Sequence, residues 1–308
     1  MITLKSNGSI DAIKDSRNMN GFLLTLLMIF IMFCVISLII FSAAMIYGVD
    51  FEASEGTPNP INSSFLSSET GTLLSLFGTG FVILIAYLFV RKFLKRSPKS
   101  LGLVDKDKIK NYGKGLILGI GILAIVVVLL RFMGIANIAI NFTNMNLLMF
   151  LLFALAWMIQ GFEEEFIFRS ILMNHFAKNG NIIRAILLNA VIFSLLHSVN
   201  NGFGILAFVN ILLVGIIFSL VFYLTDSIYL SAAFHSFWNM AQANIFGISV
   251  SGIAQSQNSV FLTSLKGPAL ISGGNFGIEA SLITTLVLAV ILIVLIKNVI
   301  DKGYVIEK

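Results

Sequence analysis

The sequence predicts an all-α fold, a polytopic transmembrane bundle of about eight helices with both termini in the cytoplasm. Of the 308 residues, 57% are hydrophobic and only 11% are charged, with a mean hydropathy of +0.96. An ordinary soluble domain carries about 25% charged residues. This composition excludes a soluble globule, which would leave large apolar areas in water, and a disordered chain, which needs the opposite balance.

Apolar runs of about 20 residues, the length that crosses the hydrocarbon core as a helix, recur along the whole chain. We therefore expect one membrane domain comprising residues 1–308. The first run is longer than the apolar core of a signal peptide and is predicted to be a retained helix. The expected spans are Gly21–Tyr47, Thr72–Val90, Tyr112–Leu130, Asn146–Phe168, Ile182–His197, Phe203–Leu224, Ile228–Phe246 and Ala280–Ile296.

The basic residues predict the orientation of these spans, because cytoplasmic loops carry an excess of Lys and Arg. Of the 20 basic residues, 17 fall in segments on the side of the N-terminus. Arg131 and Lys266 fall on the other side, and Arg169 lies within a span. The net charge of +5 therefore reflects orientation in a lipid bilayer, and we expect no nucleic-acid partner.

The connections between spans also differ in character. Gly48–Gly71 is acidic and polar and suits an extracytoplasmic loop, whereas Arg91–Lys114 is a basic linker suited to contact with anionic lipid. Gly247–Glu279, rich in Gly, Ser and Asn, is predicted to be an outer loop that packs over the bundle. Gly115 and Gly119 form a GxxxG pattern that allows close helix packing.

Four charged residues crowd into one predicted span: Glu163, Glu164, Glu165 and Arg169. Each charge inside the membrane costs about 2.5–3.5 kcal/mol on insertion scales, so this helix must line a polar cavity or pair its charges internally. Glu165 and Arg169 are four residues apart with the acid first, which is the favourable order for pairing on one helix face. Glu164 is rotated by about 100° from Glu165 and remains available to another partner.

Two histidines and an asparagine lie in later spans. His197 ends one span, and His235 shares a helical face with Asn239 four residues further on. Within apolar helices such side chains need hydrogen-bond partners, so we expect a central polar cluster of Glu164, His197, His235 and Asn239. The single cysteine, Cys34, excludes a disulfide framework and a Cys-rich zinc site.

These residues form three ordered motifs: EExxxR at Glu164–Arg169, FxxxH at Phe193–His197 and HxxxN at His235–Asn239. In this respect residues 147–246 resemble the CPBP intramembrane proteases, which include the CAAX prenyl endopeptidases and bacterial bacteriocin-processing or self-immunity proteins. These residues would then form the catalytic core. Glu163 is an additional acid that the pattern does not specify.

The resemblance implies a glutamate-dependent endopeptidase that cleaves a peptide or protein in or at the membrane. Glu164 and His197 would activate water, and His235 and Asn239 would stabilise the oxyanion. Glu165 and Arg169 would be a supporting pair. The resemblance also implies a multi-pass protein of a bacterial cell membrane.

Three alternatives remain at this point. One is a zinc site of Glu164, His197 and His235, although the favoured mechanism needs no cofactor because Asn239 suits an oxyanion better than a metal. A second is a non-proteolytic immunity or regulatory protein that binds its partner without cleavage. A third is a transporter with a buried Glu–His relay. The chain has no HExxH motif, which excludes the usual zincin pattern, and no GxSxG nucleophile elbow.

Overall fold

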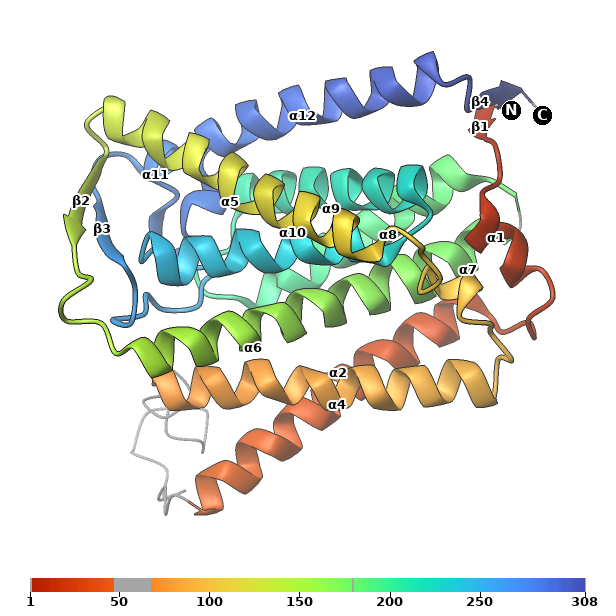
Figure 1. The fold of residues 1–308 in the computed structure, drawn as a ribbon, viewed down its shortest axis with the longest axis horizontal. Coiled ribbons are helices and arrows are strands. Elements are labelled where there is room, and N and C mark those ends of the chain that lie inside the picture. Colours follow the sequence, from red (N-terminus) through yellow and green to blue (C-terminus); the bar gives the residue numbers. More distant parts are fainter. Residues whose placement is uncertain (1, 47–67, 179, 308) are drawn as a thin grey trace.

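The computed structural model describes residues 2–46, 68–178 and 180–307, so most of the expected acidic loop Gly48–Gly71 lies outside the described residues. Long helices dominate the described chain and lie side by side as one bundle (Figure 1). Their bounds are Gly21–Ile46 (α2), Glu69–Lys92 (α4), Lys108–Phe132 (α5), Leu147–Glu165 (α6), Ile182–Leu196 (α8), Ile205–Thr225 (α9), Ile228–Met240 (α10) and Leu282–Asp301 (α12).

Each of the eight expected spans overlaps one of these helices, although α4, α5, α9 and α12 extend beyond the expected bounds. Within the described residues, seven helices are long and apolar enough to cross a membrane. The remaining expected span, Ile228–Phe246, is helical but divided, because α10 ends at Met240 and continues as a π-helical turn at Ala241–Ile245. The chain is therefore a polytopic α-helical membrane bundle, as its composition predicts.

Short elements close the two ends of the bundle. At one end, strand β1 (Ile2–Leu4) pairs antiparallel with β4 (Val305–Glu307), which brings the two chain termini together. We call this the terminal end. At the other end, β2 (Ala136–Ile140) pairs with β3 (Phe261–Leu265). The remaining short helices are α1 (Gly8–Ile13), α7 (Asn174–Ala177), α11 (Ala269–Ser272) and the 3-10 turns Lys99–Leu101, His197–Val199, Gly274–Phe276 and Ile278–Ala280.

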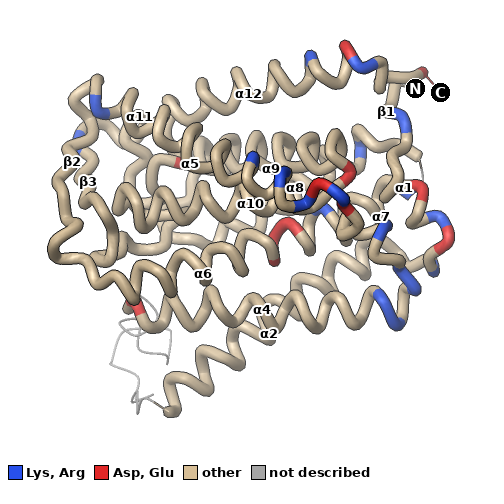
Figure 2. Tube along the Cα trace, viewed as in Figure 1, with Lys and Arg blue, Asp and Glu red and all other residues tan. Residues whose placement is uncertain are grey.

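Charge is distributed unequally between the two ends. Most Lys and Arg residues lie toward the terminal end, and few lie at the opposite end (Figure 2). Because β1 and β4 pair, the two ends of the described chain lie at the same end of the bundle. That this side faces the cytoplasm stays a prediction from the basic residues.

Helix α10 occupies the centre of the bundle, packed against α5, α6 and α9 (Figure 1). Glycines bring the neighbouring helices very close to it. A Cβ atom built at Gly119 would lie 2.6 Å from the carbonyl oxygen of Phe234, and one at Gly161 would lie 2.6 Å from the backbone nitrogen of Ser236. The GxxxG pattern of α5 therefore faces α10, and the close contact fixes the height and rotation of this central helix.

The helix that begins as α6 changes its winding after Glu165, and residues Phe166–Met173 form a π-helical segment. Arg96, fully buried in the basic linker, donates hydrogen bonds to the carbonyl oxygens of Ser170 and Ile171 at 2.7 and 3.0 Å. Ser170 in turn donates to the carbonyl oxygen of Leu101. Part of the linker that we expected to contact lipid is thus docked onto the π segment.

The glycine contact on α5 yields a matched pair of substitutions. We expect Gly119→Ala to destabilise the protein by about 1–3 kcal/mol, because the methyl group would overlap the α10 backbone. Gly121→Ala, on the same helix with nothing within 4 Å of its Cβ position, should stabilise by about 1 kcal/mol through helix propensity. Melting temperatures of the detergent-purified variants measure both effects. Equal shifts for the two variants would contradict the close α5–α10 contact.

Candidate active site

The pairing predicted from the spacing of Glu165 and Arg169 is present in the bundle interior. Nη1 of Arg169 donates to Oε1 of Glu165 at 2.7 Å, and both side chains are fully buried. The guanidinium lies over the ring of Phe193, 4.4 Å from its centroid, and 5.4 Å from that of Phe218. The aromatic faces and the carboxylate together surround a charge that has no access to water.

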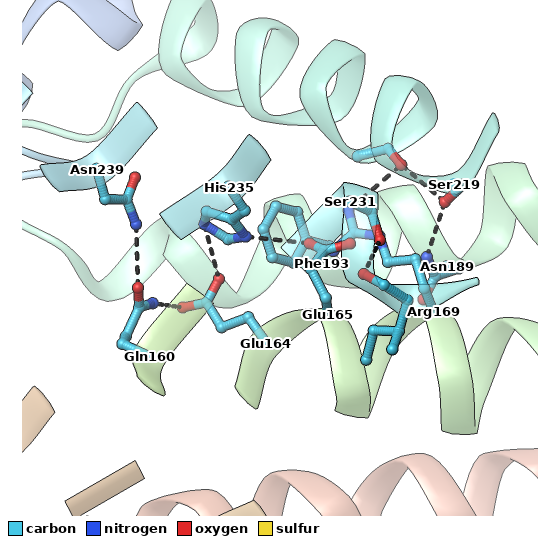
Figure 3. A network of polar contacts seen from close by, with 12 residues as sticks. Gln160, Glu164, Glu165, Arg169, Asn189, Phe193, Ser219, Ser231, His235 and Asn239 are labelled. Atoms are coloured by element: carbon cyan, nitrogen blue, oxygen red, sulfur yellow. Dashed lines mark hydrogen bonds and ion pairs between the residues drawn. The ribbon is translucent and has the colours of Figure 1, made fainter. Parts of the chain in front are cut away.

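His235 reaches this pair from α10. Its Nδ1 lies 3.0 Å from Oε1 of Glu165, so one carboxylate oxygen accepts from both the guanidinium and the imidazole (Figure 3). The ring stacks on Phe218 at 5.0 Å, which fixes its plane. Because Glu165 accepts at Nδ1, the other nitrogen, Nε2, is free to face Glu164, whose Oε2 lies 3.7 Å away. The imidazole thus spans both acids of the EExxxR motif and is held more closely by Glu165.

Glu164 and Asn239 are joined through a residue that we did not identify from the sequence, Gln160. The amide nitrogen of Gln160 donates to Oε1 of Glu164 at 2.5 Å, and its oxygen accepts from Nδ2 of Asn239 at 3.0 Å (Figure 3). Gln160 precedes Glu164 by four residues, so the helical spacing was a readable signal. The remaining oxygen of Glu164, Oε2, has no hydrogen-bond partner among the described residues.

His197 lies at the end of α8, where the helix becomes a 3-10 turn. Its Nδ1 donates to the carbonyl oxygen of Phe193 at 2.8 Å, which leaves Nε2 as an acceptor in the neutral ring. The Phe193 ring contacts both histidines, with centroid distances of 4.8 Å to His197 and 6.2 Å to His235. No hydrogen bond joins His197 directly to Glu164, in contrast to the expected cluster. The three motifs instead meet around the Phe193 ring, which contacts Arg169, His197 and His235.

A zinc site would need three ligand side chains close together. Among the described residues, no three His, Cys, Asp or Glu side chains gather closely enough to hold a metal ion. The three ligands of the zinc alternative, Glu164, His197 and His235, therefore do not form a preorganised site in this geometry. His235 directs Nδ1 to a carboxylate, which is the usual outer partner of a zinc-bound imidazole, but only Glu164 lies opposite its Nε2.

Two further titratable residues of this helix point elsewhere. Glu163, the acid outside the motif, is 2% exposed, and its Oε1 has no hydrogen-bond partner among the described residues. His175, in α7, is buried near the terminal end, and its Nε2 donates to the carbonyl oxygen of Met19 at 2.9 Å. Neither side chain forms a hydrogen bond or an ion pair with Glu165, Arg169 or His235.

A buried acid from the C-terminal half, Glu279, approaches the site from the expected outer loop. Its Oε2 accepts hydrogen bonds from the backbone and hydroxyl of Ser251 and from Gln242, whose nitrogen lies 3.3 Å away. Burial raises the pKa of Glu279, although the Ser251 hydrogen bonds, the electrostatic interaction with His197 and the Gln242 hydrogen bond lower it part of the way. We did not predict a role for Glu279 from the sequence, because its contacts with Ser251 and Gln242 join segments that are far apart in the chain.

Comparison with known proteins matches one part of the chain. Residues 145–241 match the profile of a protein family described as type II CAAX prenyl endopeptidase Rce1-like. The matched segment contains all three motifs and confirms the resemblance inferred from them. No curated protein matches the chain.

The raised pKa of Glu279 predicts a specific pH dependence of stability. A raised pKa in the folded state means that this group stabilises the fold at low pH, and that the contribution is lost as the pH rises through the raised pKa. As the pH rises from the ordinary glutamate pKa through the raised pKa, the melting temperature of the wild type should therefore fall relative to that of Glu279→Gln, which stays uncharged. Glu307→Gln, at an exposed position, should follow the wild type. Parallel curves for all three proteins would contradict the assignment.

Proposed function

We propose that this protein is an intramembrane endopeptidase that hydrolyses a peptide bond of a membrane-associated peptide or protein. The matched family consists of proteases, which supports a hydrolase at this level. The observation that carries the proposal is the position of Glu164, whose unpartnered Oε2 faces Nε2 of His235 inside a helical bundle. Hydrolysis of an amide needs a group that accepts a proton from water and groups that donate hydrogen bonds to the oxyanion. The carboxylate of Glu164 can be the first, and the imidazole and a neighbouring side-chain amide can be the second.

In the proposed reaction Glu164 accepts a proton from a water molecule as its oxygen attacks the scissile carbonyl carbon. His197, whose Nε2 is an acceptor in the neutral ring, helps to orient the same water. The proton then passes to the amine nitrogen as the C–N bond breaks, leaving a carboxylic acid and an amine. Hydrogen-bonded geometry of this kind tightens only when substrate is bound, so the 3.7 Å separation of His235 and Glu164 is compatible with this role.

His235 and Asn239 are proposed to donate to the oxyanion of the tetrahedral intermediate. Glu165 lies against Nδ1 of His235 and orients the ring so that Nε2 faces Glu164. Arg169 anchors Glu165, and Gln160 orients the Asn239 amide. The supporting residues therefore act through the donors and need not contact substrate.

The membrane setting supports a substrate that enters from the bilayer. Leader peptides, bacteriocins and signalling peptides have the required chemistry, since each is an amphipathic or apolar chain that reaches a membrane site. Maturation of such a peptide, or protection against one, is the biological role that we propose, in the membrane of a bacterial cell.

The first test uses detergent-purified protein and a mixed peptide library. Glu164→Gln should lower cleavage by about 10²–10⁴-fold, because an amide cannot accept the proton of water. Glu163→Gln makes the same change at the neighbouring buried acid and should retain cleavage. Both results should survive a strong zinc chelator. Loss on chelation would favour the zinc site, and full turnover by Glu164→Gln would overturn the mechanism.

The same substitution in cells separates proteolysis from binding. If the protein acts by sequestering a peptide, Glu164→Gln should protect or signal as well as the wild type. We expect instead that the variant accumulates in the membrane at normal levels and fails to function.

Gln160 should act as a positioning residue. Gln160→Leu preserves the approximate volume and removes both hydrogen bonds, so kcat should fall by up to about 10²-fold with little change in KM. If Gln160 acts through Asn239, the double variant with Asn239→Ala should be little slower than Asn239→Ala alone. Additive losses, or a large fall in melting temperature, would indicate an independent or purely structural role.

A further inference from the structure

A polar hollow lies at the terminal end of the bundle, away from the candidate active site. It has a volume of about 320 Å³ and lies where α2 and α8 begin, beside α7. A second hollow of about 350 Å³ shares Met19 and His175 with it, so the two adjoin. Arg184 lines the first and Lys178 lines the second.

The lining of both hollows is basic and amide-rich. Neither is lined by an Asp or Glu side chain, whereas the amides of Asn18 and Asn181 and the ring of His175 contribute to the walls. Arg184 is exposed, and its backbone N–H donates to Oδ1 of Asn181 at 2.8 Å, whereas its guanidinium makes no hydrogen bond or ion pair with another described residue. Such a lining favours an anion with several acceptor oxygens.

Lys178 leans over the same region from the end of α7. Its ammonium group donates to the carbonyl oxygen of Ser16 at 2.7 Å and to the Ser16 hydroxyl at 3.4 Å, which leaves at least one of its three N–H groups for another acceptor. Burial lowers the pKa of Lys178, and the charge of Arg96 lowers it further, while Asp15 acts in the opposite direction. A bound anion would relieve this excess of positive charge.

The opposite wall of the hollow is apolar. It continues along α8 to Ala185 and Leu188, and Leu188 is 42% exposed on the outer surface of the bundle. On α2, which begins beside it, Phe22 is 70% exposed. The hollow therefore combines cations at the end of two membrane-spanning helices with an apolar wall that runs into the hydrocarbon region. A free inorganic anion would use only the first of these features.

We propose that this hollow binds an anionic phospholipid of the leaflet on the terminal side, with Arg184 and Lys178 at the phosphate and an acyl chain along Leu188. Basic pockets between membrane helices bind lipid headgroups through this combination of charge and apolar surface. The lipid bridges the start of α2 and the turn between α7 and α8. Because the site rests on residues outside the three motifs, it is independent of the proposed peptidase activity.

Native mass spectrometry of the detergent-purified full-length protein tests this site with phosphatidylglycerol and phosphatidylcholine of equal chain length. The wild type should retain phosphatidylglycerol in preference. Arg184→Gln with Lys178→Gln should weaken its binding by about 30-fold, taking roughly one basic-residue contribution for each. Lys108→Gln with Lys110→Gln removes the same charge from exposed positions of α5 and should change binding little.

Three further arms define the ligand and guard against misfolding. Arg184→Lys with Lys178→Arg keeps both charges and should preserve binding, and Arg184→Gln alone serves if the double variant does not fold. Glycerol phosphate should compete poorly, since it lacks the acyl chain. Equal retention of both lipids, equal losses in the hollow and control variants, or equal competition by glycerol phosphate would each overturn the proposal.

Discussion

The candidate site depends on a single oxygen atom, Oε1 of Glu165, which accepts from both Arg169 and His235 among buried side chains. A buried ion pair contributes little net stability, because desolvation offsets most of the attraction. The ion pair instead fixes the relative positions of the side chains. Removing any one partner would leave an uncompensated polar group, so the helix carrying the acids and the helix carrying the imidazole are tied to one relative position. The network thus orients the groups proposed to meet the substrate.

Aromatic rings extend this constraint to the remaining helices. Phe193 from α8 and Phe218 from α9 both contact the Arg169 guanidinium, and each also contacts the His235 ring. The backbone contact at Gly161 brings α6 against α10 closely enough for these side chains to meet. The ion pair, the aromatic contacts and the close approach at Gly161 thus all hold α6, α8, α9 and α10 together. The apolar side chains on the outside of the bundle remain available to contact lipid.

Much of this arrangement follows from local sequence. Runs of apolar residues predicted the helices, and four-residue spacing predicted the Glu165–Arg169 pair, because both depend on the period of a single helix. Gln160 lies four residues before Glu164 and follows the same spacing, but we did not predict its role because its side chain carries no charge. The contacts of Glu279 with Ser251 and Gln242 depend on how distant segments pack, and neither composition nor periodicity encodes that. The π-helical turn after Met240 likewise carries Gln242 and Asn244, whose amides donate to the backbone carbonyl oxygens of Ser249 and Asn258 outside the helix.

The π-helical segment Phe166–Met173 has an evolutionary implication. A π turn holds one more residue than the α turn it replaces, so such segments are naturally understood as single-residue insertions tolerated within a helix. Here the wider winding begins immediately after Glu165 and ends where α7 leads away to the terminal end. An ancestor without the extra residue would present its downstream face rotated by about 100°, with Arg169 and His175 in a different relation to the acids. The site and the terminal end are therefore related through one helical phase, and lineages that lost the insertion would have had to rebuild both.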